Sequence, residues 1–277
     1  MTLSARNRFF KAGIAIAALC SLAVAGASFF VLPAYSFMPA QDLLRPQGFF
    51  HAFTGRLLEN SFYAVHAALS GAVVYALASA AFIYKYFEKT QSPEMFFIAL
   101  FSVSLSFEAA RLVIPLDFVF GVSSFYQFAA CRLLLLGRFF GLFSLFMASV
   151  CAAGFNAQKP WNIVLAIFFI SLIIATGIYI DLQAWGTNLN MAVGFSGLFR
   201  AVETAVAGIA VASFFASANI RGSKEYLYAG AGAAFAAMGR SLLLYADNWA
   251  GAVLGIVFLA GGTWLVCARL HRVYLWL

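Results

Sequence analysis

Eight apolar runs, each about long enough to cross a bilayer, constrain this chain more than any other feature. The runs cover residues 12–33, 62–84, 95–116, 124–154, 162–182, 196–217, 226–246 and 249–269. Because about 20 apolar residues in a helix span the hydrocarbon core of a membrane, each run predicts one transmembrane helix. The chain is 64% hydrophobic and 10% charged, whereas an ordinary soluble domain has about 25% charged residues. We therefore predict an all-α polytopic membrane helix bundle, with residues 1–277 as a single integral membrane domain.

The lysines and arginines between these runs lie mostly in alternate segments. They precede the first run and follow the second, fourth, sixth and eighth, at Arg6, Arg8, Lys11, Lys85, Lys89, Lys159, Arg221, Lys224, Arg269 and Arg272. The other loops have few, apart from Arg45 and Arg56 in the 34–61 loop. The positive-inside rule then predicts that both termini are cytoplasmic, in a multi-pass protein that we expect in a bacterial inner membrane. The net charge of +7 reflects this topology and does not indicate nucleic-acid binding.

The first run allows two interpretations. Its basic N-terminal flank, its apolar stretch and the residues Ala23, Val24 and Ala25 resemble a secretory signal peptide with its cleavage site. The apolar run continues to Pro33, which is longer than the usual signal sequence and favours an uncleaved helix. Cleavage would leave seven spans and an external N-terminus.

A weak internal similarity relates the third run to the seventh. Each begins with a short Ser-x-Glu segment and later carries an arginine and an aspartate, as Arg111 and Asp117 in one and Arg240 and Asp247 in the other. Two parallel four-helix repeats, residues 1–155 and 156–277, would explain this pattern, as in some transporters. Alanine-rich helices also resemble one another by chance, so both explanations stay open.

Ionisable residues inside the apolar runs indicate where a functional site would lie. Such groups cost roughly 2.5–3.5 kcal/mol at the centre of a membrane helix and usually face the bundle interior. The candidates are five arginines, Arg111, Arg132, Arg138, Arg200 and Arg240, with the charge partners Glu108, Glu203, Asp117 and Asp247. With both termini inside, these arginines lie toward the outer half of the bundle, where the positive-inside rule does not require them.

Two of these groups of charges have the spacing of intrahelical pairs. Glu108 with Arg111, and Arg200 with Glu203, are three residues apart and share a helix face. Such pairs can merely compensate each other. The excess of arginine over glutamate is more informative, because an unpaired guanidinium in a bundle requires an anionic or carbonyl partner. Arg138 is the best single candidate, since it lies deepest and is the hardest to extend to the headgroups.

These observations predict a membrane carrier or binding protein with an arginine-rich outer-half cavity for an anionic small molecule or lipid headgroup. The alternative is a membrane sensor or assembly subunit that acts through a protein partner docked on the cytoplasmic loops 85–94 and 218–225. An enzyme is the weaker expectation, because no nucleophile–base pair or metal-ligand spacing is visible. Gly-Phe-Ser-Gly at 194–197 resembles a protease serine motif but has no suitably placed histidine.

The remaining motifs are best explained by packing. The four cysteines lie in apolar runs without metal-ligand spacing, so we expect no metal and no cofactor. We expect His66 to be a hydrogen-bonded core histidine. Gly137 with Gly141, and Gly251 with Gly255, have the four-residue spacing that allows two helices to approach closely.

Overall fold

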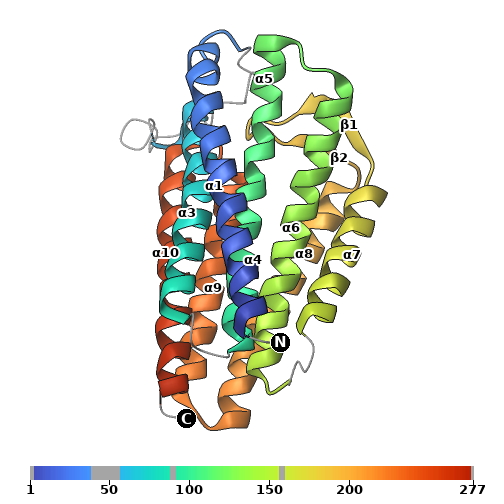
Figure 1. Cartoon of the computed structure of the whole chain (residues 1–277). Helices are drawn as coiled ribbons and strands as arrows, with labels where there is room; N and C mark the ends of the chain where they lie inside the picture. The colour runs from blue at the N-terminus through green and yellow to red at the C-terminus, as the bar shows by residue number, and fades with distance from the viewer. Residues whose placement is uncertain (1–2, 39–56, 88–91, 156–159, 276–277) are drawn as a thin grey trace.

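The structure, a computed structural model, describes residues 3–38, 57–87, 92–155 and 160–275 as a bundle of long helices (Figure 1). Within these ranges eight helices are long and apolar enough to cross a membrane, which confirms the predicted all-α membrane bundle. The helices are α1 (Leu3–Ala34), α3 (Phe62–Phe87), the consecutive α4 (Pro93–Ser104), η1 (Leu105–Leu112) and α5 (Val113–Phe120), then α6 (Ser124–Ala152), α7 (Pro160–Gly177), α8 (Ser196–Arg221), α9 (Lys224–Tyr245) and α10 (Trp249–Leu275).

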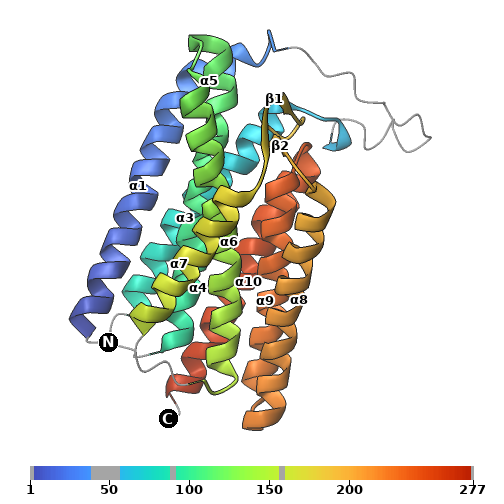
Figure 2. The same cartoon turned by 90° about the vertical axis from the view of Figure 1, so that its right-hand side faces the viewer.

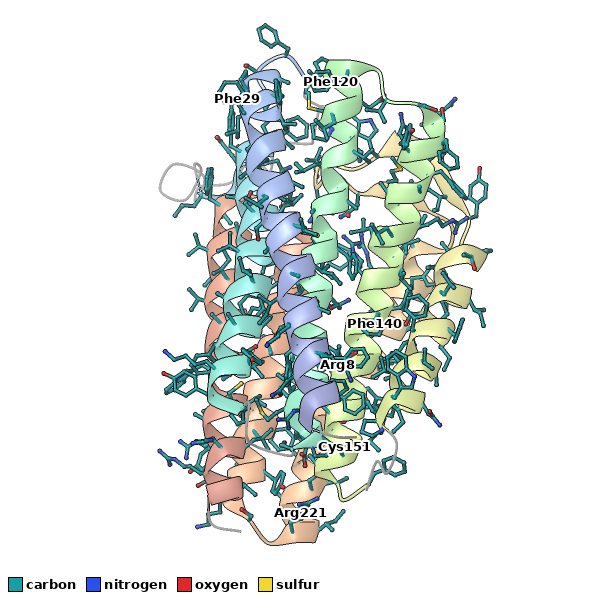
Figure 3. The ribbon with its side chains drawn as sticks, in the orientation of Figure 1. Arg8, Phe29, Phe120, Phe140, Cys151 and Arg221 are labelled. Carbon is teal, nitrogen blue, oxygen red and sulfur yellow. The ribbon has the colours of Figure 1, made fainter. Side chains whose placement is uncertain are left out.

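The two ends of the bundle differ in character. Helix α1 begins and α10 ends at the same end, which we call the termini end, and a β-hairpin lies toward the opposite, hairpin end (Figures 1 and 2). Arg8 and Arg221 lie toward the termini end, whereas Phe29 and Phe120 lie at the other (Figure 3).

Several predicted features fall outside the described residues: Arg45 and Arg56 of the 34–61 loop, Lys89 within the 85–94 loop, and Lys159.

The third span is interrupted at its centre by a 3₁₀ segment, η1, which the apolar pattern did not predict. The hydroxyls of Ser104 and Ser106 donate to the carbonyls of Phe101 and Val103, both at 2.7 Å, and so compete with the regular helical bonds. Pro115 lacks an N–H and its ring opposes the carbonyl four residues earlier. Because side chains three residues apart eclipse each other in a 3₁₀ helix, η1 places Glu108 directly beside Arg111.

Helix α6 packs closely on this third span through its two glycines. A Cβ atom on Gly137 would lie 2.6 Å from the Cβ of Phe107, and one on Gly141 would lie 2.0 Å from the hydroxyl of Ser104. The predicted close approach at Gly137 and Gly141 is therefore confirmed, and it brings Arg138 within reach of η1.

Helices α9 and α10 form a second close contact, built on glycines of both helices. A Cβ on Gly239 would lie 2.3 Å from the backbone nitrogen of Leu259 and 2.7 Å from the carbonyl oxygen of Gly255. Gly262 has the same relation to Gly232, whose carbonyl oxygen would lie 2.5 Å away. Only glycine fits at such positions, so this helix pair is fixed by backbone contact.

A two-stranded antiparallel hairpin, β1 (Ile180–Trp185) and β2 (Met191–Val193), connects α7 to α8. The predicted fifth span, 162–182, ends earlier than expected, because α7 stops at Gly177. Arg132 of α6 explains this end: its Nη1 donates to the carbonyls of Ala175 and Ile178. The last carbonyls of a helix lack partners within the helix, and a basic side chain supplies one here.

Candidate functional site

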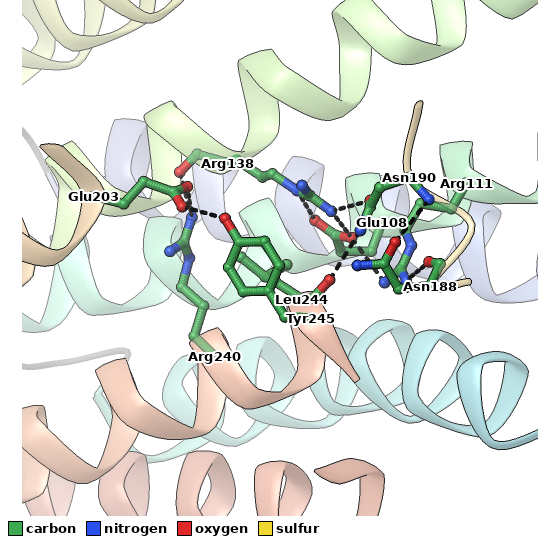
Figure 4. A network of polar contacts seen from close by, with 9 residues as sticks. All are labelled: Glu108, Arg111, Arg138, Asn188, Asn190, Glu203, Arg240, Leu244 and Tyr245. Carbon is green, nitrogen blue, oxygen red and sulfur yellow. Dashed lines mark hydrogen bonds and ion pairs between the residues drawn. The ribbon is translucent and has the colours of Figure 1, made fainter. Parts of the chain in front are cut away.

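Three arginine and two glutamate side chains, from η1, α6, α8 and α9, meet inside the bundle (Figure 4). We call them the buried charge cluster: Glu108, Arg111, Arg138, Glu203 and Arg240. Their side chains are between 1% and 13% exposed. All five were candidates from the sequence, although they come from four separate helical segments.

Glu108 is the first of the two acceptors in the cluster. Arg138 donates from Nε to Oε1 at 2.9 Å and from Nη2 to Oε2 at 3.0 Å, a two-pronged contact that fits the planar guanidinium to the carboxylate. Arg111 donates from Nη1 to Oε2 at 3.4 Å, which is the predicted pair three residues apart. One carboxylate thus serves two guanidinium groups.

Glu203 is the second acceptor, and it does not form the pair that the sequence predicted. Its spacing pointed to Arg200 on the same helix. Instead, its carboxylate lies 3.6 Å from Nη2 of Arg240 and accepts a hydrogen bond of 2.9 Å from the hydroxyl of Tyr245. Arg240 also donates to the carbonyl oxygen of Arg138 at 2.8 Å. Arg240 therefore joins the Glu203 side of the cluster to the Glu108 side.

The hairpin reaches into the cluster through the turn between its strands. Arg111 donates from Nη2 to the carbonyl of Asn188, and Arg138 donates from Nη2 to Oδ1 of Asn190 at 2.7 Å. Asn190 in turn donates to the carbonyl of Leu244 at 3.1 Å. The asparagines and Tyr245 were missed from the sequence. The only signal was a polar Asn-x-Asn segment between two apolar runs, which resembles any short loop.

Arg132 and the two aspartates lie apart from the cluster. Arg132 binds the end of α7 and stacks over the ring of Phe128 at 4.5 Å. Asp247 accepts from its neighbour Asn248 at 3.0 Å, and its carbonyl accepts from the backbone of Ser61 at 2.9 Å. Asp117 lines a small cavity of about 110 Å³ near the hairpin. Arg132 and Asp247 thus make local contacts, and none of the three residues joins an ion pair among the described residues.

Arg200 lies beside the cluster without joining it. Its guanidinium is 4.8 Å from the centre of the Tyr245 ring, which is cation–π distance, and among the described residues no carboxylate pairs with it. Tyr245 thus contacts Arg200 through its ring and donates a hydrogen bond to Glu203 through its hydroxyl.

A cavity of about 260 Å³ adjoins the cluster, between α6, the hairpin and the facing parts of α8 and α9. Its polar lining includes Arg138, Asn190, Ser196, Arg200, Glu203 and Tyr245. The lining therefore combines two guanidinium groups and one carboxylate with the apolar side chains of Leu134, Leu135 and Phe199. Small-ligand sites also combine apolar walls with convergent polar groups, although this lining is more polar than most.

The charges at this cavity do not cancel. Arg138 and Arg200 line it against one carboxylate, that of Glu203. The rest of the cluster, which does not line the cavity, adds Arg111 and Arg240 against Glu108. Arg138 uses Nε and Nη2 for Glu108 and Asn190, and its Nη1 has no hydrogen-bond partner among the described residues. The cavity wall therefore offers guanidinium donors that an anion could engage.

Other titratable groups are accounted for by packing. The prediction for His66 is confirmed: its Nε2 is 2.8 Å from the hydroxyl of Ser28 and its Nδ1 is 3.1 Å from that of Tyr35. The four cysteines are free thiols. Within the described ranges, no group of three or more His, Cys, Asp or Glu side chains is placed to hold a metal ion.

No protein-family model matches this chain, and a comparison with curated proteins found no significant match.

Proposed function

We propose that this protein is a membrane carrier or binding protein that holds an anionic small molecule or lipid headgroup in the cavity beside Arg138. The observation that carries the proposal is the excess of guanidinium groups at a partly open space of about 260 Å³. Guanidinium groups bind carboxylates and phosphates through two parallel hydrogen bonds, and they remain charged when buried. Since a water in the liquid occupies about 30 Å³, a space of about 260 Å³ has room for a small anion or one headgroup and not for a large metabolite.

The cluster itself supports a binding role, because it holds the basic groups in fixed positions. Arg138 is oriented by Glu108 and Asn190 before any ligand arrives. Such preorganisation lowers the entropy that a ligand loses on binding. Glu203, which also lines the cavity, would repel an anion unless it faces Arg240 and Tyr245, as it does here.

We also propose that both termini are cytoplasmic, so that the cavity belongs to the outer half of a bacterial inner-membrane protein. The described basic residues near the chain ends and in the α8–α9 turn support this orientation under the positive-inside rule. A transport step would then begin with an anion entering from the hairpin side.

Arg200 offers the sharpest test, because it lines the cavity without supporting the buried ion pairs. We expect Arg200→Gln to weaken binding of acetate or inorganic phosphate to the purified protein about tenfold, or ~1.4 kcal/mol, measured by calorimetry. The matched control is Arg269→Gln, which removes an equal charge from the partly exposed pair with Glu225 at the termini end. Equal affinity in the wild type and in Arg200→Gln would overturn the proposal.

A second function, that of a sensor or assembly subunit, is favoured by one observation. The network of Glu108, Arg138, Arg240 and Asn190 connects η1, α6, α9 and the hairpin, so it could hold helices in register with no ligand at all. A stoichiometric protein partner that co-purifies with the chain, and whose binding is lost when residues 218–225 are replaced, would support this function. Binding of an anion at the cavity would instead support the carrier.

A further inference from the structure

A second hollow, larger than the cavity, runs along the outside of the bundle between α8 and α9. It has a volume of about 720 Å³ and is lined mainly by small or apolar side chains, among them Ala207, Gly208, Ala234 and Ala237. We call it the α8–α9 groove. Three of its polar residues, Tyr245, Asp247 and Asn248, lie where α9 ends, toward the hairpin end, and the other two are Thr204 and Ser241.

The groove has the dimensions of one lipid chain. Tyr245 follows Ala234 by 11 residues on α9, which corresponds to about 16 Å of helix. Half of a hydrocarbon core about 30 Å thick is about 15 Å, the depth of one leaflet. The groove lies between two spans on the bundle surface, where an apolar hollow would be filled from the bilayer. Its length and lining therefore match a single acyl chain of the leaflet at the hairpin end.

The groove and the charged cavity lie on either side of one side chain. Tyr245 lines both spaces, and Glu203 on the cavity side is followed directly by Thr204 on the groove side. Arg200 lies over the ring of the same tyrosine and pairs with no carboxylate among the described residues. An apolar groove thus lies next to a guanidinium group that has no carboxylate partner, with the Tyr245 ring between them. A guanidinium group is the charge complement of a lipid phosphate.

We infer that the anionic ligand of this site is a phospholipid, with its phosphate at Arg200 and one acyl chain in the α8–α9 groove. This inference rests on the proposed anion-binding function and selects its ligand class. Asp247 at the mouth of the groove is a second carboxylate, which disfavours a doubly charged free phosphate more than a singly charged phosphodiester. Phosphatidylglycerol is therefore the appropriate probe.

The test uses three variants and native mass spectrometry of the full chain in detergent. Gly208→Leu fills the groove. This variant should fold, because a Cβ on Gly208 meets nothing within 4 Å and because leucine has a higher helix propensity than glycine. The matched control is Gly261→Leu on α10, whose Cβ also meets nothing within 4 Å and which does not line the groove. Arg200→Gln tests the phosphate contact.

We expect Gly208→Leu and Arg200→Gln each to reduce phosphatidylglycerol binding about tenfold, and Gly261→Leu to leave it unchanged. Diacylglycerol, which has the chains without the phosphate, should bind weakly to the wild type. Equal binding of diacylglycerol, or full binding by Gly208→Leu, would overturn the inference. So would a dimer that dissociates in Gly208→Leu, because the groove would then hold a second copy of the chain.

Failure of this inference can be distinguished from failure of the proposed function. If acetate or inorganic phosphate binds and depends on Arg200 while phosphatidylglycerol does not compete, the ligand is a small anion and only the lipid inference fails. If neither the small anions nor the lipid binds, the anion-binding function itself is wrong.

Discussion

Arg138 donates two parallel hydrogen bonds to Glu108, at 2.9 and 3.0 Å, between the middle of α6 and the 3₁₀ segment of the third span. The contact depends on Gly137, because any larger residue there would push α6 away from Phe107. It also depends on η1, which turns Glu108 toward α6 while keeping it beside Arg111. A buried carboxylate between two guanidinium groups is therefore central to the fold as well as to the cavity.

Glu108→Gln should strongly destabilise the bundle. It removes the charge that compensates Arg111 and Arg138, and breaking one side of a buried ion pair costs about 3–5 kcal/mol. We expect a large fall in the thermal unfolding temperature of the protein in detergent. Intrinsic fluorescence would measure this unfolding. The double variant Glu108→Gln/Arg138→Gln should recover part of the loss, since one uncompensated charge is removed with it.

Glu225→Gln is the matched control for that change. Its partner is Arg269 at 3.3 Å, and both side chains are about a quarter to a third exposed, at 30% and 25%. Such a pair is worth about 0–1 kcal/mol. A loss at Glu225 as large as that at Glu108 would show that burial of the pair is not what makes Glu108 important.

Asn190→Ala should release the hairpin from the bundle. The side chain accepts from Arg138 and donates to Leu244, so its removal leaves a buried guanidinium and a carbonyl without these partners. We expect hydrogen exchange to rise across residues 180–193, with a loss of stability of about 1–3 kcal/mol. Gln183→Ala in the exposed part of β1 is the control and should leave exchange in the hairpin as in the wild type.

Gly239→Ala should separate α9 from α10. Its new Cβ would meet backbone atoms of Leu259 and Gly255, which cannot rotate away as side chains do. Overpacking of this kind costs about 1–3 kcal/mol, which thermal unfolding in detergent would detect. Gly261→Ala, whose Cβ meets nothing within 4 Å, should be neutral or stabilising by up to about 1 kcal/mol. Equal effects of the two changes would contradict the close helix contact.

The proposed orientation predicts which residues are reachable from outside the cell. In a chain without its native cysteines, Gln183→Cys in the hairpin should react with a membrane-impermeant maleimide on intact cells. Lys224→Cys, at the first residue of α9, should react only after the membrane is permeabilised. The reverse pattern would place the termini outside and the cavity in the inner half.

The membrane class, the number of spans and all five charged residues of the cluster could be predicted from the sequence. Each of these depends on local properties: a run of apolar residues long enough to cross the bilayer, and the high cost of an ionisable group within it. The spacing of Gly137 and Gly141 indicated a close helix contact, but the same spacing does not always do so, because a Cβ on Gly251 would meet only its chain neighbours Asn248 and Ala246. The proposed two-repeat organisation, 1–155 and 156–277, stays a prediction.

Partners in space were not predictable. The three-residue spacing of Arg200 and Glu203 pointed to a pair, yet Glu203 turns to Arg240 and Tyr245 because α9 lies against α8. Arg132, equally placed by its sequence, binds the end of α7 because that helix stops beside it. Asn188 and Asn190 join the cluster only because the hairpin folds back over the bundle. The sequence by itself determined which charges must be compensated inside the membrane. Helix packing decided which partner compensates each, because that choice depends on distances between segments remote along the chain.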